Sequence, residues 1–316
     1  MTAVEPARRA VKATFTASNA RGVAFTARGR GGKVGVFVQL VRAPAALTVL
    51  GDTIAGGAAA GTPLHGRRWT LPLASACFYW AGMALNDWAD RRLDAVERPE
   101  RPIPSGRITP GTALTTGGVL TAAGLGLAGF GGGQRALRAA VPLAAAVWAY
   151  DTTLKGTAAG PLGMATCRAL DVLMGSGGRW RRAAPAAAAL GVHTAGVTAV
   201  SAGEVHGGSP GTGALALAGT ATATGLAVAG RAGGRTDRIA ALGYGAGYAA
   251  TVGRAQYRAT TTPSADRVRA ATAAGIHGMV PLQASLTARY GSGRVAALLA
   301  GALPLARRLA RKVSPT

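Results

Sequence analysis

The sequence predicts an all-α protein that crosses a membrane many times, as a multi-pass transmembrane bundle of about nine helices. Its 316 residues are 49% hydrophobic, and their mean hydropathy is +0.24. Only 15% of the residues are charged, whereas soluble domains usually carry about a quarter. Long stretches with almost no charge recur, and several reach the roughly 20 residues that span a bilayer. Many of them consist of Ala, Gly and Thr, which weakens each individual assignment.

The helix ends follow from the prolines and glycines between these apolar stretches. We expect the first helix over 34–60 and the second over 69–86. Pro99 and Pro102 prevent the helical segment that follows from continuing further. The later helices are expected over 110–131, 136–151, from about 161, and over 183–201, 212–230, 238–257, 266–285 and 291–309.

The two ends of the chain differ from this membrane domain, which we place at 34–310. Residues 1–33 are basic and poor in aliphatic side chains, which predicts a disordered tail at the membrane surface, and 311–316 form a short second tail. No apolar signal-peptide core follows Arg8 and Arg9, although an organellar transit peptide would have a similar composition.

The net charge of +23 comes mainly from arginines that lie between the apolar stretches. At these positions they would meet lipid headgroups, so a bilayer is the expected partner and a nucleic acid is not. The basic tail and the arginine-rich connection after the second helix both favour the cytoplasmic side, whereas basic connections at 179–182 and 231–238 would then face outward.

Five of the twelve acidic residues lie within 87–100. If this segment is helical, Asp87, Asp90 and Asp94 lie on one face. At about 6 Å and an effective dielectric of about 20, each mutual repulsion costs about 3 kcal/mol. Mg²⁺ would remove this cost, and it usually binds through one or two carboxylates together with phosphate oxygens. The spacing therefore indicates a magnesium–diphosphate site, but a solvated helix end paired with neighbouring arginines explains it equally well.

Two other pairs of polar residues are candidates for function. Arg168 and Asp171 lie within the fifth helix, where ionisable groups are costly, although a mutual salt bridge would also account for them. Glu204 and His206 follow the sixth helix, and even-numbered helices finish on the same side, so this loop could meet the aspartates. His206 is a candidate base, or it only orients the loop.

The run Asn86-Asp87-x-x-Asp90-x-x-x-Asp94, followed by Arg101-Pro-Ile-Pro-Ser-Gly-Arg107, resembles the first signature of the UbiA superfamily of intramembrane prenyltransferases. The resemblance extends over 36–310 and includes Tyr150-Asp151-x-x-Leu-Lys155. It implies a helical bundle around a central cavity, with Mg²⁺ and an isoprenyl diphosphate held near the cytoplasmic face. Members of the family transfer the prenyl group to an acceptor, commonly an aromatic ring or a lipid precursor.

The resemblance also implies roles for individual residues. Arg101 and Lys155 would supply counter-charges to the diphosphate. Arg168 is a further candidate substrate-binding residue, because it is an ionisable group within an apolar helix. Tyr150 would stabilise an allylic cation or contact the acceptor. The residues that would bind Mg²⁺ and the diphosphate are Asn86, Asp87, Asp90 and Asp94.

The chain departs from the family at its second signature, which usually contains two aspartates spaced as DxxxD. Here the region contains Glu204 and His206, followed by Gly207 and Gly208. This SxxEVxGG pattern is similar to that of a branch that includes EboC-like proteins. Either Glu204 alone binds a second Mg²⁺, or the acceptor chemistry differs, or the site is impaired.

The leading hypothesis is an integral-membrane, Mg²⁺-dependent prenyltransferase that uses a prenyl diphosphate and an unidentified acceptor of aromatic, quinone-precursor or lipid-like type. We expect it in the plasma membrane with its site facing the cytoplasm. A non-catalytic carrier or scaffold that binds a lipid diphosphate is the alternative. A CDP-alcohol phosphotransferase fits less well, because the glycine and the Ala-Arg pair required after that family's first aspartates do not occur here.

Overall fold

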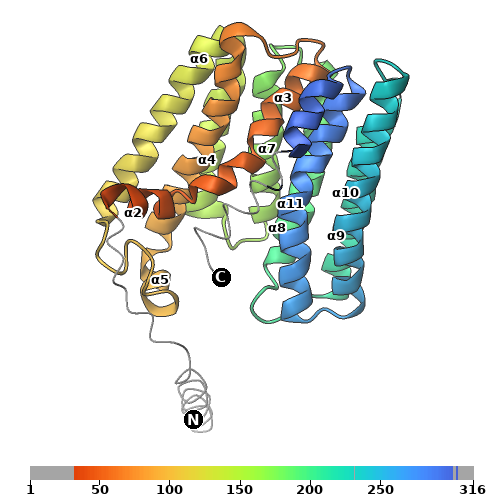
Figure 1. Cartoon of the computed structure of the whole chain (residues 1–316). Coiled ribbons are helices and arrows are strands. Elements are labelled where there is room, and N and C mark those ends of the chain that lie inside the picture. Colours follow the sequence, from red (N-terminus) through yellow and green to blue (C-terminus); the bar gives the residue numbers. More distant parts are fainter. Residues whose placement is uncertain (1–31, 231, 302–303, 305–316) are drawn as a thin grey trace. The chain divides into compact units, whose positions relative to one another are not determined.

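The computed structural model describes residues 32–230, 232–301 and 304 (Figure 1). Within this part of the chain all regular structure is helical, with ten α-helices and short 3₁₀ and π segments, which confirms the all-α prediction. Contacts divide the chain into Met1–Val34 and Gly35–Thr316, and the second unit is the helical bundle. Of the two predicted tails, only Gly32 and Lys33 lie within the described residues.

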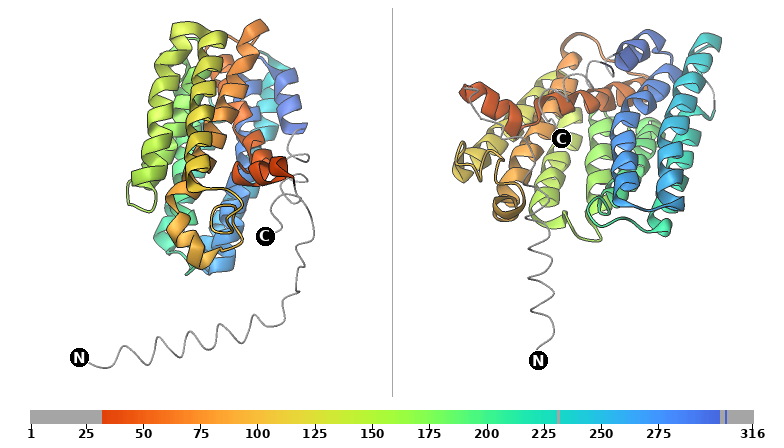
Figure 2. Two further views of the ribbon diagram at one scale, coloured as in Figure 1. Left: turned by 90° about the vertical axis from the view of Figure 1, so that its left-hand side faces the viewer. Right: turned by 60° about the horizontal axis from the view of Figure 1, so that its bottom comes forward.

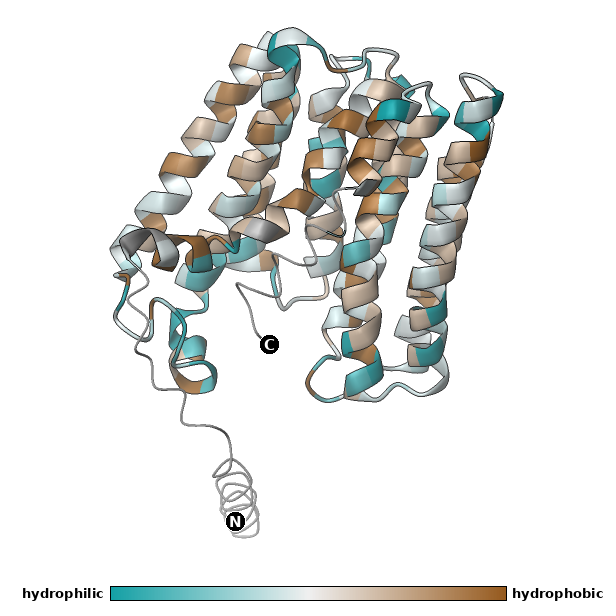
Figure 3. Ribbon diagram, viewed as in Figure 1, coloured by the Kyte–Doolittle hydropathy of each residue, from teal (hydrophilic) through white to brown (hydrophobic). Residues whose placement is uncertain are grey.

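Four of the described helical segments are long and apolar enough to cross a membrane. These segments are Gly35–Ala59, Pro110–Leu154, Trp180–Ser201 and Pro210–Val228. Figure 3 shows hydrophobic residues along the bundle and many hydrophilic residues near the helix ends. The helix count is close to the nine expected, although fewer helices are apolar enough to be recognised as spans by composition.

The predicted first helix is broken into three pieces. These are α2 (Lys33–Leu40), a 3₁₀ turn η1 (Ala43–Thr48) and α3 (Leu50–Ala59). The break lies at Arg42, whose φ of 47° is in the left-handed region. Pro44 explains why a helix cannot run through this point, because it has no N–H to donate to a carbonyl four residues earlier. The prediction of one continuous helix was therefore wrong.

The next two elements form the segment that carries the aspartates. The helix α4 (Thr70–Ala89) follows a 3₁₀ turn, η2 (Gly66–Trp69), and leads into the short helix α5 (Arg91–Glu97).

The element α6 (Pro110–Ala149) contains the third and fourth predicted helices. Its backbone turns at Gly133, with φ of 60° and ψ of −154°, a conformation that favours glycine. Trp148 Nε1 donates to Thr121 Oγ1 at 3.1 Å, so the limb after Gly133 runs back beside the limb before it. A π-helical turn, η3 (Tyr150–Leu154), follows.

The remaining helices match the predicted ones to within a few residues. They are α7 (Gly160–Gly175), α8 (Trp180–Ser201), α9 (Pro210–Val228), α10 (Arg235–Thr261) and α11 (Ala265–Arg289). Thr109 and Ser209 each precede a proline and accept a hydrogen bond from a backbone N–H three residues later, which begins α6 and α9. Residues 293–301 are helical, and most of the rest of the predicted helix over 291–309 lies outside the described residues.

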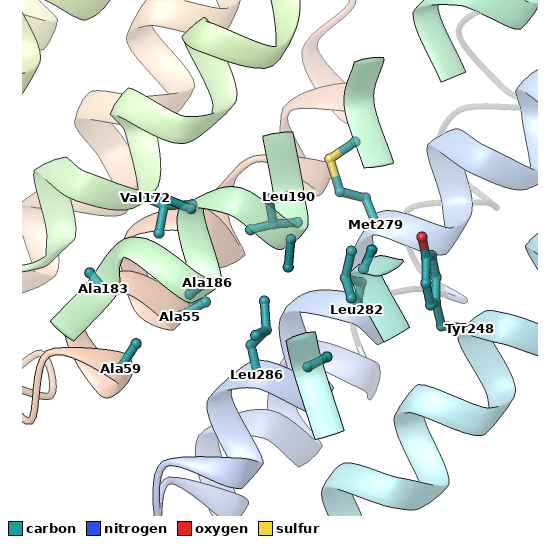
Figure 4. Close-up of a cluster of buried hydrophobic side chains, with 14 of the residues drawn as sticks. Ala55, Ala59, Val172, Ala183, Ala186, Leu190, Tyr248, Met279, Leu282 and Leu286 are labelled. Atoms are coloured by element: carbon teal, nitrogen blue, oxygen red, sulfur yellow. The ribbon is translucent and has the colours of Figure 1, made fainter. Parts of the chain in front are cut away.

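Small residues let these helices approach closely. The helices lie side by side in the views of Figure 2, and the largest core cluster joins α3, α7, α8, α9, α10 and α11 (Figure 4). At the crossing of α3 and α7, a Cβ atom on Gly56 would lie 1.9 Å from the carbonyl oxygen of Val172. The backbones are therefore in contact, which explains why Gly and Ala replace larger apolar residues in these helices.

We expect Gly56→Ala to lower the free energy of unfolding by about 1–3 kcal/mol, because the added methyl group must push α3 away from α7. Thermal denaturation of the purified protein in detergent measures this effect. Gly118→Ala in α6 is the matched control, since nothing lies within 4 Å of a Cβ atom there. Equal melting temperatures for Gly56→Ala and the wild type would contradict the close crossing.

Candidate functional site

The three aspartates of the acidic run lie along one nearly continuous helical segment. Asp90 joins α4 to α5, its backbone N–H donates to Asn86 O at 2.9 Å, and its carbonyl accepts from the N–H of Asp94 at 2.9 Å. The helical spacing expected for Asp87, Asp90 and Asp94 is therefore present. Asp87 and Asp94 are only 4% and 2% exposed, so their charges need partners.

Arg101 provides one of these partners. Its Nη1 lies 2.6 Å from Asp94 Oδ2 and 3.4 Å from Asp87 Oδ1, so a single guanidinium bridges both buried carboxylates. The turn after α5 holds Arg101 in place, because its carbonyl accepts the N–H of Ser105 at 3.0 Å. Ile103 packs into a small hydrophobic cluster beneath this turn. The structure thus brings Arg101, a predicted counter-charge to the diphosphate, to the aspartates.

A second partner, Arg42, was not among the predicted site residues. Its Nη2 lies 3.3 Å from Asp87 Oδ1, across 45 positions of the sequence. The left-handed backbone of Arg42 costs of order 1–3 kcal/mol for a residue other than glycine. Such conformations persist where the surroundings enforce them and cluster at functional sites. The only signal in the sequence was an arginine two residues before a proline within an apolar stretch.

The π-helical turn η3 supplies the third cation. Lys155 Nζ forms an ion pair with Asp90, and Asn86 Nδ2 donates to Asp151 Oδ1 at 3.4 Å. Asp151 is only 6% exposed and was not predicted as a site residue. Short π segments inside helices are rare and occur frequently at functional sites.

These contacts show which cations pair with the acidic run. The carboxylates are paired, but their partners Arg42, Arg101 and Lys155 come from three separate connections. The arginines within α5, which are closer in sequence, form no ion pairs with these carboxylates in the described part of the chain. Arg91, for example, lies over the Trp88 ring at 4.8 Å. An ordinary local salt-bridge pattern therefore does not describe the cluster.

A cavity of about 210 Å³ lies within the bundle, and it meets the acidic run at Asn86 and at Asp151, the hydrogen-bond partner of Asn86. Asn86, Tyr150 and Asp151 line it near the cluster, and Ser75, Arg168 and Asp171 also form part of its wall. The remaining lining residues are Val49, Phe78, Tyr79, Gly82, Met83, Leu143, Val147, Met164 and Cys167. The wall is thus mostly apolar, and the ring of Tyr150 belongs to it.

Arg168 does not pair with the residue that its spacing suggested. Its Nη1 lies 2.6 Å from Asp52 Oδ2 in α3, while Asp171 Oδ1 accepts from Ser75 Oγ at 2.5 Å. The hypothesis of a salt bridge between Arg168 and Asp171 was wrong, because packing of α3 against α7 brings a nearer carboxylate to the guanidinium. Asp52, a lone acid in an apolar stretch, was overlooked in the sequence.

Glu204 and His206 are not joined to the aspartates by any hydrogen bond or ion pair within the described part of the chain. Their loop is held elsewhere, because Glu204 O accepts from Arg269 Nη1 at 2.7 Å and Gly208 N donates to Pro263 O at 2.9 Å. These contacts therefore do not join the loop to the acidic cluster.

A larger hollow lies away from these groups. Its volume is about 470 Å³, and it is lined by Arg135, Arg138, Gly178, Arg179, Trp180, Arg181 and Arg182. A wall with this composition holds cations but no carboxylate, thiol or imidazole. It therefore offers neither metal ligands nor a base, and the smaller cavity beside the aspartates is the candidate site.

Protein side chains alone do not form a complete metal site here. Across 32–230 and 232–301, no group of three or more His, Cys, Asp or Glu side chains is close enough to hold a metal ion. The oxygen donors nevertheless have the chemistry that Mg²⁺ prefers, provided that a ligand supplies further oxygens.

Comparison with known proteins identifies relatives of this chain. The model of the UbiA prenyltransferase family matches residues 49–206. The digeranylgeranylglyceryl phosphate synthase of Korarchaeum cryptofilum is 35% identical over 99 residues, which cover 31% of this chain and 35% of that relative. The chain thus matches only about a third of the relative's length.

Solved structures show the same fold. The apo structure of a UbiA homologue from Aeropyrum pernix K1 has a TM-score of 0.60 and 18% identity, covering 76% of this chain and 96% of the other. A UbiA homologue from Archaeoglobus fulgidus, bound to GPP and Mg²⁺, has a TM-score of 0.51 and 15% identity, covering 76% and 99%. At this identity the likeness concerns the fold.

Removing the bridge between the two buried carboxylates should destabilise the protein. We expect Arg101→Leu to lower the free energy of unfolding by about 3 kcal/mol, because it leaves Asp87 and Asp94 without this cation. Mg²⁺ should restore part of the lost melting temperature in the variant. Arg92→Leu is the control, as an exposed arginine of α5 without a hydrogen bond or ion pair. A variant as stable as the wild type would show that the bridge contributes little.

Proposed function

This chain belongs to the UbiA prenyltransferase family, and we propose on this basis that it transfers an isoprenyl group from a prenyl diphosphate to an apolar acceptor within the membrane. The observation that carries the proposal is the arrangement of Asp87, Asp90 and Asp94 among three cations, next to Asn86, which lines an apolar cavity. The acceptor belongs to the aromatic, quinone-precursor or lipid-like classes.

The charges of the cluster suit a diphosphate bound together with Mg²⁺. Asp87, Asp90 and Asp94, with the amide oxygen of Asn86, would hold the metal, which supplies positive charge to the leaving diphosphate when bound. Arg101 and the cations Arg42 and Lys155 would then exchange their carboxylate partners for diphosphate oxygens. Every charge keeps a partner in this exchange, so neither the acids nor the bases become unpaired.

The cavity suits the reactive part of the donor. When the allylic C–O bond breaks, its electron pair leaves with the diphosphate, and the carbon atom that becomes cationic must be kept from water. The acceptor then forms a bond to this carbon and releases a proton. Tyr150 lines the cavity next to the acidic cluster, which supports the proposal that its ring contacts the cation.

We also propose that the site faces the cytoplasm from the plasma membrane. The support is the basic connection that carries it, because positively charged loops remain preferentially on the cytoplasmic side. Within 91–107 this connection contains Arg91, Arg92, Arg98, Arg101 and Arg107.

The carrier hypothesis retains one specific observation in its favour. Glu204, the remaining acid of the second signature, makes no contact with the aspartates among the described residues. Glu204 and His206 stay candidates for the acceptor side of the reaction, and Glu204 for a second Mg²⁺. A protein without this half of the site would bind the diphosphate and not turn it over.

Membranes that contain the protein should consume a labelled geranylgeranyl diphosphate in the presence of Mg²⁺ and acceptor-containing lipid extract. We expect Asp90→Ala and Asp94→Ala to lower this rate by about 100-fold or more, because groups that stabilise the leaving charge are lost. A chelator should have the same effect on the wild type. Glu97→Ala, an exposed acid of the same helix, is the matched control and should remain active.

The outcomes separate the two hypotheses. Full activity in both aspartate variants would contradict the site. Tight binding of the diphosphate without turnover, lost in Asp90→Ala, would favour a carrier. Mass spectrometry of lipids from cells with and without the protein would then identify the product or show that none is formed.

A further inference from the structure

A second group of buried polar side chains, from α3, α4, α7 and α11, lies along the cavity. We call Asp52, Ser75, Arg168, Asp171 and Gln283 the inner polar group. Four of its members are at most 5% exposed, and Ser75, Arg168 and Asp171 line the cavity. The diphosphate site uses none of them, so their burial has another reason.

The cation of this group is already neutralised. Arg168 Nη1 lies 2.6 Å from Asp52 Oδ2, and the other oxygen, Asp52 Oδ1, accepts from Gln283 Nε2 at 2.6 Å. Asp52 and Gln283 are fully buried, which keeps this pair in a setting of low dielectric where separation is costly. Arg168 is therefore held by the protein and is not free to bind an anion.

The second acid removes any excess of positive charge. Asp171 accepts from Ser75 Oγ at 2.5 Å, and Asp52 pairs with Arg168, so the inner polar group contains two acids and one cation. A ligand carboxylate placed here would be a third acid beside one cation.

The cavity itself restricts what can lie against this group. Its volume of about 210 Å³ is below the roughly 300 Å³ at which pockets for drug-sized ligands begin, so it admits a small ring or one end of a longer molecule. An isoprenyl tail pressed against Asp171 and Ser75 would remove water without offering a hydrogen bond, which is unfavourable. The occupant at this position therefore has a polar end.

We infer that the inner polar group binds the acceptor through a neutral hydroxyl group and rejects acceptors that present a carboxylate. A hydroxyl can donate to a carboxyl oxygen of Asp171 or to Ser75 Oγ, whose own proton is donated to Asp171, and it brings no charge into the bundle. The acceptor class is thus a small phenol or alcohol, or the hydroxylated end of a lipid. This inference rests on the proposed function in one respect, since it identifies the occupant as the acceptor.

Binding measured without any prenyl diphosphate tests the inference separately from activity. The full-length protein in nanodiscs would be titrated with 4-fluorobenzyl alcohol and with 4-fluorobenzoate, followed by ¹⁹F NMR against empty nanodiscs. We expect saturable binding of the alcohol and at least about tenfold weaker binding of the benzoate, because the latter would be buried without a free counter-charge.

Two variants make the test specific. Asp171→Asn should weaken binding of the alcohol several-fold. Binding of the benzoate should stay weak in this variant, because the Asp52–Arg168 pair persists. The double variant Asp52→Asn/Asp171→Asn leaves Arg168 without a carboxylate, so the benzoate should now bind more tightly than the alcohol. Asp237→Asn, a partly exposed acid at the start of α10, is the matched control and should behave as the wild type.

Equal binding of the two probes, tighter binding of the benzoate, or the absence of saturable alcohol binding in the wild type would each overturn the inference. So would unchanged alcohol affinity in Asp171→Asn, which decides the matter even if the double variant does not fold. Alcohol binding in a protein that shows no prenyl transfer would leave the inference standing and count against the proposed function. Efficient prenyl transfer to carboxylate acceptors would overturn the inference and support the proposed function.

Discussion

Two buried carboxylates, Asp87 and Asp94, impose the constraint on which the rest of this structure depends. An unpaired carboxylate inside a membrane bundle costs several kcal/mol, so burial of both is possible only if cations reach them. The chain supplies these cations from elements far apart in sequence. The left-handed backbone at Arg42 and the turn that holds Arg101 are the local consequences of satisfying this one electrostatic requirement.

A second buried carboxylate, Asp52, must also be paired with a cation, but its pair differs in exposure from those of the acidic cluster. Near the acidic cluster the cations are partly exposed, with Arg42 and Lys155 side chains 39% and 31% accessible, so they can exchange partners with an entering anion. Around Asp52 the acid is fully buried and Arg168 is only 12% accessible, so the pair is closed. One protein thus contains a partly exposed set of paired charges and a buried set of paired charges.

Helix packing by small residues makes both arrangements possible. Gly56 of α3 and Gly175 of α7 allow backbone contact, since a Cβ atom on Gly175 would lie 2.0 Å from Thr53 O. This close crossing brings Asp52 within reach of Arg168. A bundle built from leucine would separate the two helices by the width of its side chains and leave both charges without partners. The abundance of Gly and Ala is therefore tied to the buried polar contacts.

The sequence by itself determined the helical class, most helix positions and the residues of the acidic run, because these depend on hydropathy, proline and local spacing. The 3.6-residue repeat alone places Asp87, Asp90 and Asp94 on one face. Only the tertiary structure decided which cations meet them, that Arg168 pairs with Asp52, and that Glu204 makes no contact with the cluster. Such contacts join positions up to 116 residues apart. They depend on which helices cross and how closely, and local periodicity carries no information about either.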